Sequence, residues 1–267
     1  MMEKIQLKDI DCKSLKPLEN QGNTSSIYIY DGECYKFLDK LDVSLKPGLY
    51  EKISDIEGME VDGIILPKKI IEDNGNFVGY VTDYFSQSAT LYDYFTKKRY
   101  EDANDILVAT KKASIILKNA HKSGIVLQDV SFDNFLIDEN GNVRLCDIDS
   151  CKYKERYGHY ISGPLKDYYL HMHRLPEINE NLDRQSLFFS MLLTMYHKRV
   201  LSLSTYDELS QEIKTLKELR NIMFSLLITT NTWVPYLDEV IVDNDHYTID
   251  RNTQVSKEKA LKNDYSL

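Results

Sequence analysis

Several residue types are scarce in this chain, and long apolar runs are missing. Of its 267 residues, 11 are glycine, 6 are proline and 4 are cysteine. So little glycine and proline excludes collagen-like, elastin-like and linker-dominated chains. The longest apolar run lies within residues 186–196, well short of the roughly 20 residues that a membrane-spanning helix needs. We therefore expect a soluble protein with no membrane partner.

Basic charge is also in short supply. Lysine and arginine number 33 against 42 acidic residues, which gives a formal net charge of −9. This excess of negative charge argues against a general nucleic-acid binder. No signal-peptide core follows Met1, and the cysteines contain no C-x-x-C pair. We expect a cytoplasmic protein whose four cysteines are free thiols, namely Cys12, Cys34, Cys146 and Cys151.

What the chain does contain suits a full hydrophobic core. Apolar residues make up 42% and charged residues 28%, and the length fits one domain of two joined lobes. Residues 1–85 predict a β-rich lobe, with strands at 26–30, 33–38, 64–71 and 77–85. Asp31-Gly32 and residues 73–76 predict hairpin turns. The spacing of Leu49, Ile53 and Ile56 predicts one helix over 49–56.

The pattern changes to helix after residue 100. Apolar spacing predicts a helix over 102–123 that ends at Gly124, followed by a hairpin with strands at 135–137 and 143–146. Residues 151–178 have no clear period, whereas 183–197 predict a buried helix and 206–228 a helix with a break. The chain is therefore predicted to be a single α+β domain over 1–267, with lobes at 1–85 and 86–240 and a tail at 241–267.

The loop after the 102–123 helix carries the polar residues best suited to chemistry. Asp129 and Asn134 lie in this loop, and Asp147 ends the hairpin that follows it. Each of the three is next to apolar residues that can anchor a loop or strand. We expect the three side chains to converge on one rigid point.

These motifs resemble those of protein kinases. Leu127-Gln128-Asp129 together with Asn134 is similar to H-R-D-x-x-x-x-N, and Asp147-Ile148-Asp149 occupies the place of D-F-G. Leu175-Pro176-Glu177 resembles A-P-E, and residues 183–187 resemble the start of the buried helix after it. The resemblance covers roughly residues 18–228. It implies a bilobal kinase-like fold with a small antiparallel sheet, one helix in the first lobe and a mainly helical second lobe.

The resemblance also implies roles for individual residues. Asp129 would accept the proton of the substrate hydroxyl, and Asn134 and Asp147 would hold Mg²⁺ on the phosphates of ATP. Lys36 occupies the place of the lysine in V-A-I-K. Its partner would be a glutamate of the first-lobe helix, and we choose Glu51, with Glu57 and Glu60 as further candidates.

The remaining nucleotide contacts are predicted from the same resemblance. The phosphate loop would lie between two strands, where small side chains let backbone N–H groups approach phosphate, and it has one glycine where the family pattern has three. Ile27 would cover the base, and a hinge around Tyr84 would contact adenine through its backbone. The predicted nucleotide-binding residues outside the catalytic loop are Gly22, Asn23, Thr24, Ser25, Ile27, Lys36, Glu51, Asp83 and Phe85.

The sequence departs from the kinase pattern at four positions. Leu127 and Gln128 replace His and Arg, Ser131 occupies a place where many serine/threonine kinases have Lys, and Asp149 replaces Gly. Without that Arg, control by a phosphorylated activation loop is not expected. The proton acceptor, metal ligands and lysine are all present.

The favoured interpretation is an ATP- and Mg²⁺-dependent serine/threonine protein kinase that acts on a protein substrate. Two alternatives stay open. One is a pseudokinase that binds nucleotide or a partner without turnover, and the other is a small-molecule kinase of the aminoglycoside phosphotransferase type. The histidines show no metal-site spacing, and we interpret them as structural or surface residues, namely His121, His159, His171 and His173.

Overall fold

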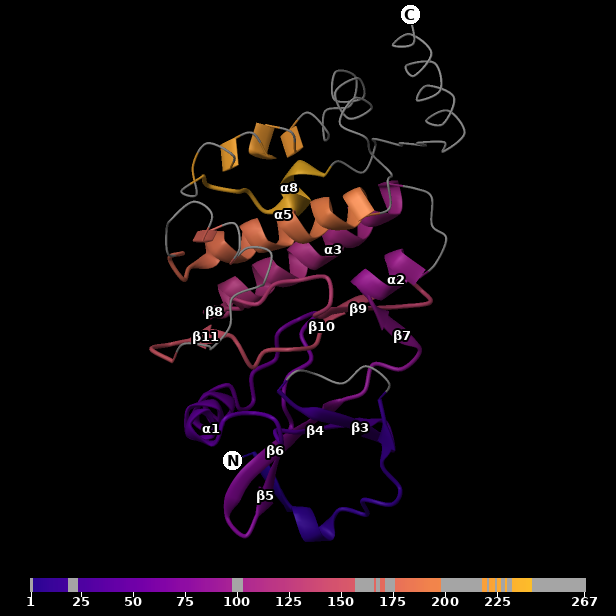
Figure 1. Cartoon of the computed structure of the whole chain (residues 1–267), viewed down its shortest axis with the longest axis vertical. Coiled ribbons are helices and arrows are strands. Elements are labelled where there is room, and N and C mark those ends of the chain that lie inside the picture. Colours follow the sequence, from indigo (N-terminus) through magenta and orange to yellow (C-terminus); the bar gives the residue numbers. More distant parts are fainter. Residues whose placement is uncertain are drawn as a thin grey trace, which may run out of the picture.

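The computed structural model describes residues 2–18, 24–97, 103–156, 166, 169–170, 176–197, 218–219, 221–223, 225–226, 229 and 232–241. Within this part of the chain, strands dominate up to residue 83 and helices dominate afterwards. Figure 1 shows the larger sheet at one end of the molecule and the long helices at the other. The architecture is therefore mixed α+β, with a multistranded N-terminal sheet, as predicted.

The N-terminal sheet has six strands in the order β1-β5-β6-β4-β3-β2. Every neighbouring pair is antiparallel except β1 and β5, which run parallel. The strands are β1 (Glu3–Gln6), β2 (Lys16–Pro17), β3 (Ser26–Tyr30), β4 (Glu33–Phe37), β5 (Lys69–Asp73) and β6 (Asn76–Asp83). The short elements η1 (Leu7–Asp9) and η2 (Val43–Leu45) lie beside it.

Both predicted hairpins form in this sheet. Asp31 and Gly32 have φ values of 48° and 76°, and Asn74 and Gly75 have 49° and 82°. Two successive left-handed residues match the twist of the strands on either side. The predicted strand at 64–71 is wrong in its first part, because β5 begins only at Lys69 and Ile64 forms an isolated bridge to Leu145.

Helix α1 (Lys46–Asp55) covers one face of the sheet. The Asp42 side chain accepts a hydrogen bond from the Ser44 backbone N–H at the start of η2, and Pro47 lies in the first turn of α1. Leu49 and Ile53 pack into a core with the side chains Leu38, Ile70 and Tyr80. The helix begins three residues before the predicted start, because proline is well tolerated in a first turn.

The second half is built on α3 (Ala103–Lys122) and α5 (Glu180–His197), which pack against each other (Figure 1). Around them lie α2 (Leu91–Lys97) and α8 (Leu237–Val240). A three-stranded sheet, β10-β9-β7, and a two-stranded pair, β11-β8, complete this half. Their bounds are β7 (Ser88–Thr90), β8 (Ile125–Val126), β9 (Phe135–Asp138), β10 (Val143–Leu145) and β11 (Lys152–Tyr153).

One large hydrophobic cluster fills this half, and Phe95, Leu107, Phe135 and Phe188 are fully buried in it. Across the described residues, the helices are all too short or too polar to pass through a bilayer. The predicted tail beyond Ile241, Leu175 and most of the predicted 206–228 helix lie outside the described residues.

Candidate functional site

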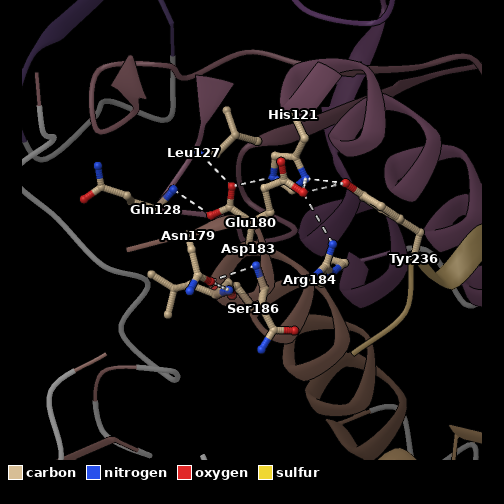
Figure 2. Close-up of polar contacts among 11 residues, drawn as sticks. His121, Leu127, Gln128, Asn179, Glu180, Asp183, Arg184, Ser186 and Tyr236 are labelled. Atoms are coloured by element: carbon tan, nitrogen blue, oxygen red, sulfur yellow. Dashed lines mark hydrogen bonds and ion pairs between the residues drawn. The ribbon is translucent and has the colours of Figure 1, made fainter. Parts of the chain in front are cut away.

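The loop that carries Asp129 is anchored by a buried carboxylate. Gly124, with φ 79°, turns the chain from α3 into β8. The backbone N–H groups of Leu127 and Gln128 then donate to the two carboxylate oxygens of Asp183, at 2.6 and 2.8 Å. Asp183 lies on α5 and has no exposed surface (Figure 2). Two charge-assisted hydrogen bonds to one buried side chain fix the path of the loop.

His121, on α3, links this anchor to Tyr236, the residue directly before α8. Its Nε2 lies 2.9 Å from Asp183 Oδ2, and its Nδ1 lies 2.8 Å from the Tyr236 hydroxyl (Figure 2). The ring is buried, so the interpretation of His121 as structural fits its place. The role of Asp183 as the anchor of the loop was not predicted. Its position at the start of a buried helix was the only signal for it in the sequence.

The loop itself is held in an uncommon backbone conformation. Gln128 has a φ of 66° and is almost fully buried, and its Nε2 has no partner among the described residues. Residues other than glycine rarely adopt a positive φ unless the surrounding structure imposes it. Asn134 closes the loop, because its Nδ2 donates to the Asp129 carbonyl at 2.7 Å.

Asp129 is partly buried in this loop. Burial raises the pKa of its carboxyl, and the negative charge of Asp147 raises it further. The sequence predicts that Asp129, Asn134 and Asp147 converge. The effect of Asp147 on Asp129 agrees with this prediction, and so does a hydrogen bond between the loop and the end of the hairpin. In that hydrogen bond, the Cys146 N–H donates to the Asn134 carbonyl at 2.9 Å.

Lys36 reaches Asp147 from the N-terminal sheet. Lys36 lies on β4 opposite Ile27 and Tyr80, and its Nζ is 3.1 Å from Asp147 Oδ1 and 2.7 Å from Asp149 Oδ2. Burial alone would lower the pKa of the lysine, but Asp147 and then Asp149 outweigh this and hold it well above its ordinary value. Burial raises the pKa of Asp147, and Lys36 opposes that rise.

The predicted pairing of Lys36 with Glu51 is wrong. The Glu51 side chain is 54% exposed and pairs with Arg156. The next residue, Lys52, is the one that points inward, where it donates to the carbonyls of Asp149 and Cys151, the latter at 2.8 Å. The physical reason is helix geometry, because Glu51 is rotated by about 200° from Leu49 and Lys52 by only about 60°.

The predicted phosphate loop is described only in part. Gly22 and Asn23 lie outside the described residues. Thr24 is half-buried, and Ser25 is fully buried, with its carbonyl accepting from Lys40 Nζ at 3.3 Å. Ile27 faces Lys36 across the β3–β4 ladder. The structure thus places the described part of this segment beside the strand that carries Lys36.

The residues predicted to form the hinge lie at the end of β6 and directly after it. Asp83 ends β6 and pairs with Lys68, and the Tyr84 N–H donates to the Gly32 carbonyl at 2.9 Å. Asp83 and Phe85 line a cavity of about 1120 Å³ that Arg144 also borders. The residues that meet at Asp147 do not line this cavity, so it is separate from the candidate site.

The donor set near Asp147 fits magnesium better than a transition metal. Within the described segments, His, Cys, Asp and Glu nowhere gather in a group of three or more that could hold a metal. Asp147 and Asn134 offer one carboxylate and one amide oxygen. Mg²⁺ is commonly bound by one or two carboxylates together with water and substrate phosphates.

Comparison with known proteins adds no family to this picture. No protein-family model matches the chain, and a search of curated proteins finds no similar sequence. The functional conclusion therefore rests on the residues that the fold brings together, which are Lys36, Asp129, Asn134 and Asp147.

Proposed function

We propose that this protein is an ATP-dependent phosphotransferase with a bilobal kinase-like fold, and that it transfers the γ-phosphate to serine or threonine hydroxyls of a protein substrate. One observation carries the proposal. A buried lysine of the N-terminal sheet, Lys36, lies 3.1 Å from Asp147, which ends a hairpin of the other half. Phosphoryl transfer depends mainly on positioning and on neutralising phosphate charge. At this junction a cation lies beside a carboxylate that, under the proposal, would bind the metal.

The other residues of the junction then take complementary roles. Lys36 would bind phosphate oxygens of ATP, while Asp147 and Asn134 would hold Mg²⁺, which neutralises phosphate charge when it is bound. Asp129 would accept the proton of the attacking hydroxyl. Its raised pKa, caused by burial and by Asp147, makes it a stronger base than an exposed aspartate.

The buried anchor of the loop supports this assignment. Asp183 fixes the backbone of Leu127 and Gln128, directly before Asp129. A proton acceptor that must sit within hydrogen-bond reach of a substrate hydroxyl gains from such fixed placement.

A protein substrate is favoured over a small molecule on the evidence of the resemblance. Leu175-Pro176-Glu177 and residues 183–187 resemble the elements on the protein-substrate side of protein kinases. A pseudokinase is disfavoured because the lysine, the proton acceptor and both metal ligands are all present. Each of these alternatives gives a different result in the experiment below.

The test is phosphate transfer from γ-labelled ATP in the presence of Mg²⁺, to the protein itself and to a generic protein substrate. We expect transfer by the wild type, a loss of about 100-fold or more in Asp129→Asn, and a comparable loss in Lys36→Met. Asp138→Asn, at the end of β9, is the matched control and should retain activity.

Each other outcome points elsewhere. Nucleotide binding without transfer to any acceptor would support the pseudokinase, and transfer only to an added aminoglycoside or alcohol would support the small-molecule kinase. Transfer that is undiminished in Asp129→Asn would contradict the proposed catalytic loop.

A further inference from the structure

We propose that Asp149, and not a glutamate of helix α1, is the carboxylate that positions Lys36 for phosphate. The inference rests on the proposed function and names a further positioning residue at the same site. It starts from the closest ion pair of the lysine, because Asp149 Oδ2 lies 2.7 Å from Lys36 Nζ, whereas Asp147 Oδ1 lies 3.1 Å away.

Asp149 is itself held in one orientation. The Tyr80 hydroxyl donates to its Oδ1, while its Oδ2 contacts Lys36. Its side chain is only 15% exposed. Tyr80 and Lys36 are direct partners in the β4–β6 ladder, so two adjacent strands each contribute one group to the same carboxylate. Both oxygens of Asp149 are therefore engaged by the N-terminal sheet.

Helix α1 contributes to this arrangement through a cation rather than an anion. Lys52 is 2% exposed and donates to the carbonyls of Asp149 and Cys151. The helix thus fixes the backbone of the turn that carries Asp149. A carboxylate on this face of α1 would meet those two carbonyls instead of a donor, so the counter-charge for Lys36 has to come from the turn.

This arrangement lets the two aspartates have separate roles. A metal ion on Asp147 would compete with Lys36 for that carboxylate, and Asp149 would still hold the lysine charged and in place. We therefore expect Asp149 to act through Lys36. Its loss should weaken the stabilisation of phosphate charge in the transition state of phosphate transfer. Removing an interaction that acts in the transition state lowers kcat more than it changes KM.

The first experiment compares steady-state phosphate transfer among four variants. We expect Asp149→Asn to lower kcat by about tenfold or more with KM for ATP changed less than about threefold. Tyr80→Phe should show a smaller loss in the same direction. Glu51→Gln should lose less than either, and Asp73→Asn, at the end of β5, is the matched aspartate control.

The second experiment measures the lysine itself and does not need activity. Brief labelling with acetic anhydride at one fixed pH, followed by peptide mass spectrometry, gives the rate at which Lys36 is acetylated. We expect Lys36 to be labelled several-fold faster in Asp149→Asn than in the wild type, because its closest ion pair is lost, and at an unchanged rate in Asp73→Asn. A purely structural role for Asp149 would speed the labelling of the buried Lys52 to the same extent.

The outcomes separate this inference from the proposed function. If the wild type transfers phosphate but Asp149→Asn matches Asp73→Asn in both kcat and the labelling rate of Lys36, the inference is wrong while the function stands. If the wild type transfers no phosphate to any acceptor, the function fails, and an unchanged labelling rate of Lys36 in Asp149→Asn would then also remove the positioning role.

Discussion

The loop that carries Asp129 and the helix α1 are attached to the rest of the protein in opposite ways. The loop is held by Asp183 and His121, whose side chains are almost completely buried. The outer face of α1 is held by Glu51 and Asp55, which pair with Arg156 at the surface. Among the charged residues of α1, Lys52 on the inner face reaches a buried contact, beside the apolar packing of Leu49 and Ile53.

This difference separates a fixed part of the site from an adjustable one. In a buried charged network, a group that loses its partner cannot hydrogen-bond to water instead. Moving any member is therefore costly, and the network keeps one geometry. Exposed ion pairs exchange readily with water and salt, and each contributes little to stability. We expect Asp129 to stay in place while α1, and the turn at Asp149 with it, can shift at lower cost.

The largest expected effect comes from breaking the buried anchor. In Asp183→Asn one carboxylate oxygen becomes an NH₂ group, which would face a backbone N–H or the His121 ring instead of accepting from it. We expect the free energy of unfolding to fall by about 3 kcal/mol, because a buried donor loses its partner and the network loses its charge. Urea unfolding followed by circular dichroism measures this change.

Asp138→Asn provides the matched control for that substitution. Asp138 also accepts from two backbone N–H groups, those of Asn140 and Asn142, but in an exposed turn. Water can replace the lost hydrogen bonds there, so we expect a clearly smaller change in the urea midpoint. Equal losses in the two variants would show that burial does not distinguish the two carboxylates.

A smaller effect is expected on the inner face of α1. Lys52→Met keeps the length and apolar stem of the side chain but removes the donor to two carbonyls. Because the variant also avoids the cost of burying an ammonium group, the net loss of stability should be only roughly 1 kcal/mol. Phosphate transfer should fall more than stability does, since the turn at Asp149 loses its attachment. Norleucine at this position would test whether the thioether matters.

The contrast also explains what the sequence could and could not predict. Local patterns predicted the hairpin turns, the buried helices and the cluster around Asp129, because each depends on neighbouring residues. The pairing of Lys36 depends on which residue of α1 faces inward. The spacing of Leu49 and Ile53 already placed Lys52 on that face. The choice of Glu51 followed the resemblance to kinases instead of this spacing, and it was wrong.

Other features had no local signal. Strand β1 pairs with β5 across more than sixty residues of sequence, and the polar segment Glu3–Gln6 gives no alternation that predicts a strand. Asp183 joins Leu127 and Gln128 across a similar separation. Contacts of this kind are fixed by the packing of α3 on α5, and a single sequence does not show which buried carboxylate will meet which backbone group.

The ionised carboxylate of Asp129 is expected to lower the stability of the folded protein in a pH-dependent way. Burial and then Asp147 raise the pKa of this carboxyl in the folded protein, so the folded state binds the proton more tightly than the unfolded state does. The stability of the wild type should therefore fall as the pH rises from about 4 through the folded pKa. Asp129→Asn removes this cost.

Thermal unfolding at several pH values between 4 and 7 tests the sign. We expect Asp129→Asn to be close to the wild type at the acidic end and modestly more stable at neutral pH, even though its phosphate transfer is lost. A variant that is less stable than the wild type at neutral pH would mean that the loop stabilises the charged carboxylate. Asp133→Asn removes an exposed acid of the same loop, whose carboxyl pKa is also raised, by partial desolvation and then by Asp93. It is the control for a general effect of losing an acid in this loop.

The smallest effect is expected at the outer face of α1. Arg156→Gln removes the ion pairs to Glu51 and Asp55, of which the Asp55 contact is 2.7 Å long. Because these groups are open to solvent and screened by salt, we expect the melting temperature to fall by roughly 2 °C or less. The difference in melting temperature between variant and wild type should shrink between 0.05 and 0.5 M NaCl.

The same substitution should also have a small kinetic effect. The two ion pairs join α1 to the segment after β11, so their loss frees α1. We expect KM for ATP to rise slightly and kcat to stay near that of the wild type. A loss of stability that is large and independent of salt would place this surface attachment in the same class as Asp183, and α1 would then be as fixed as the loop.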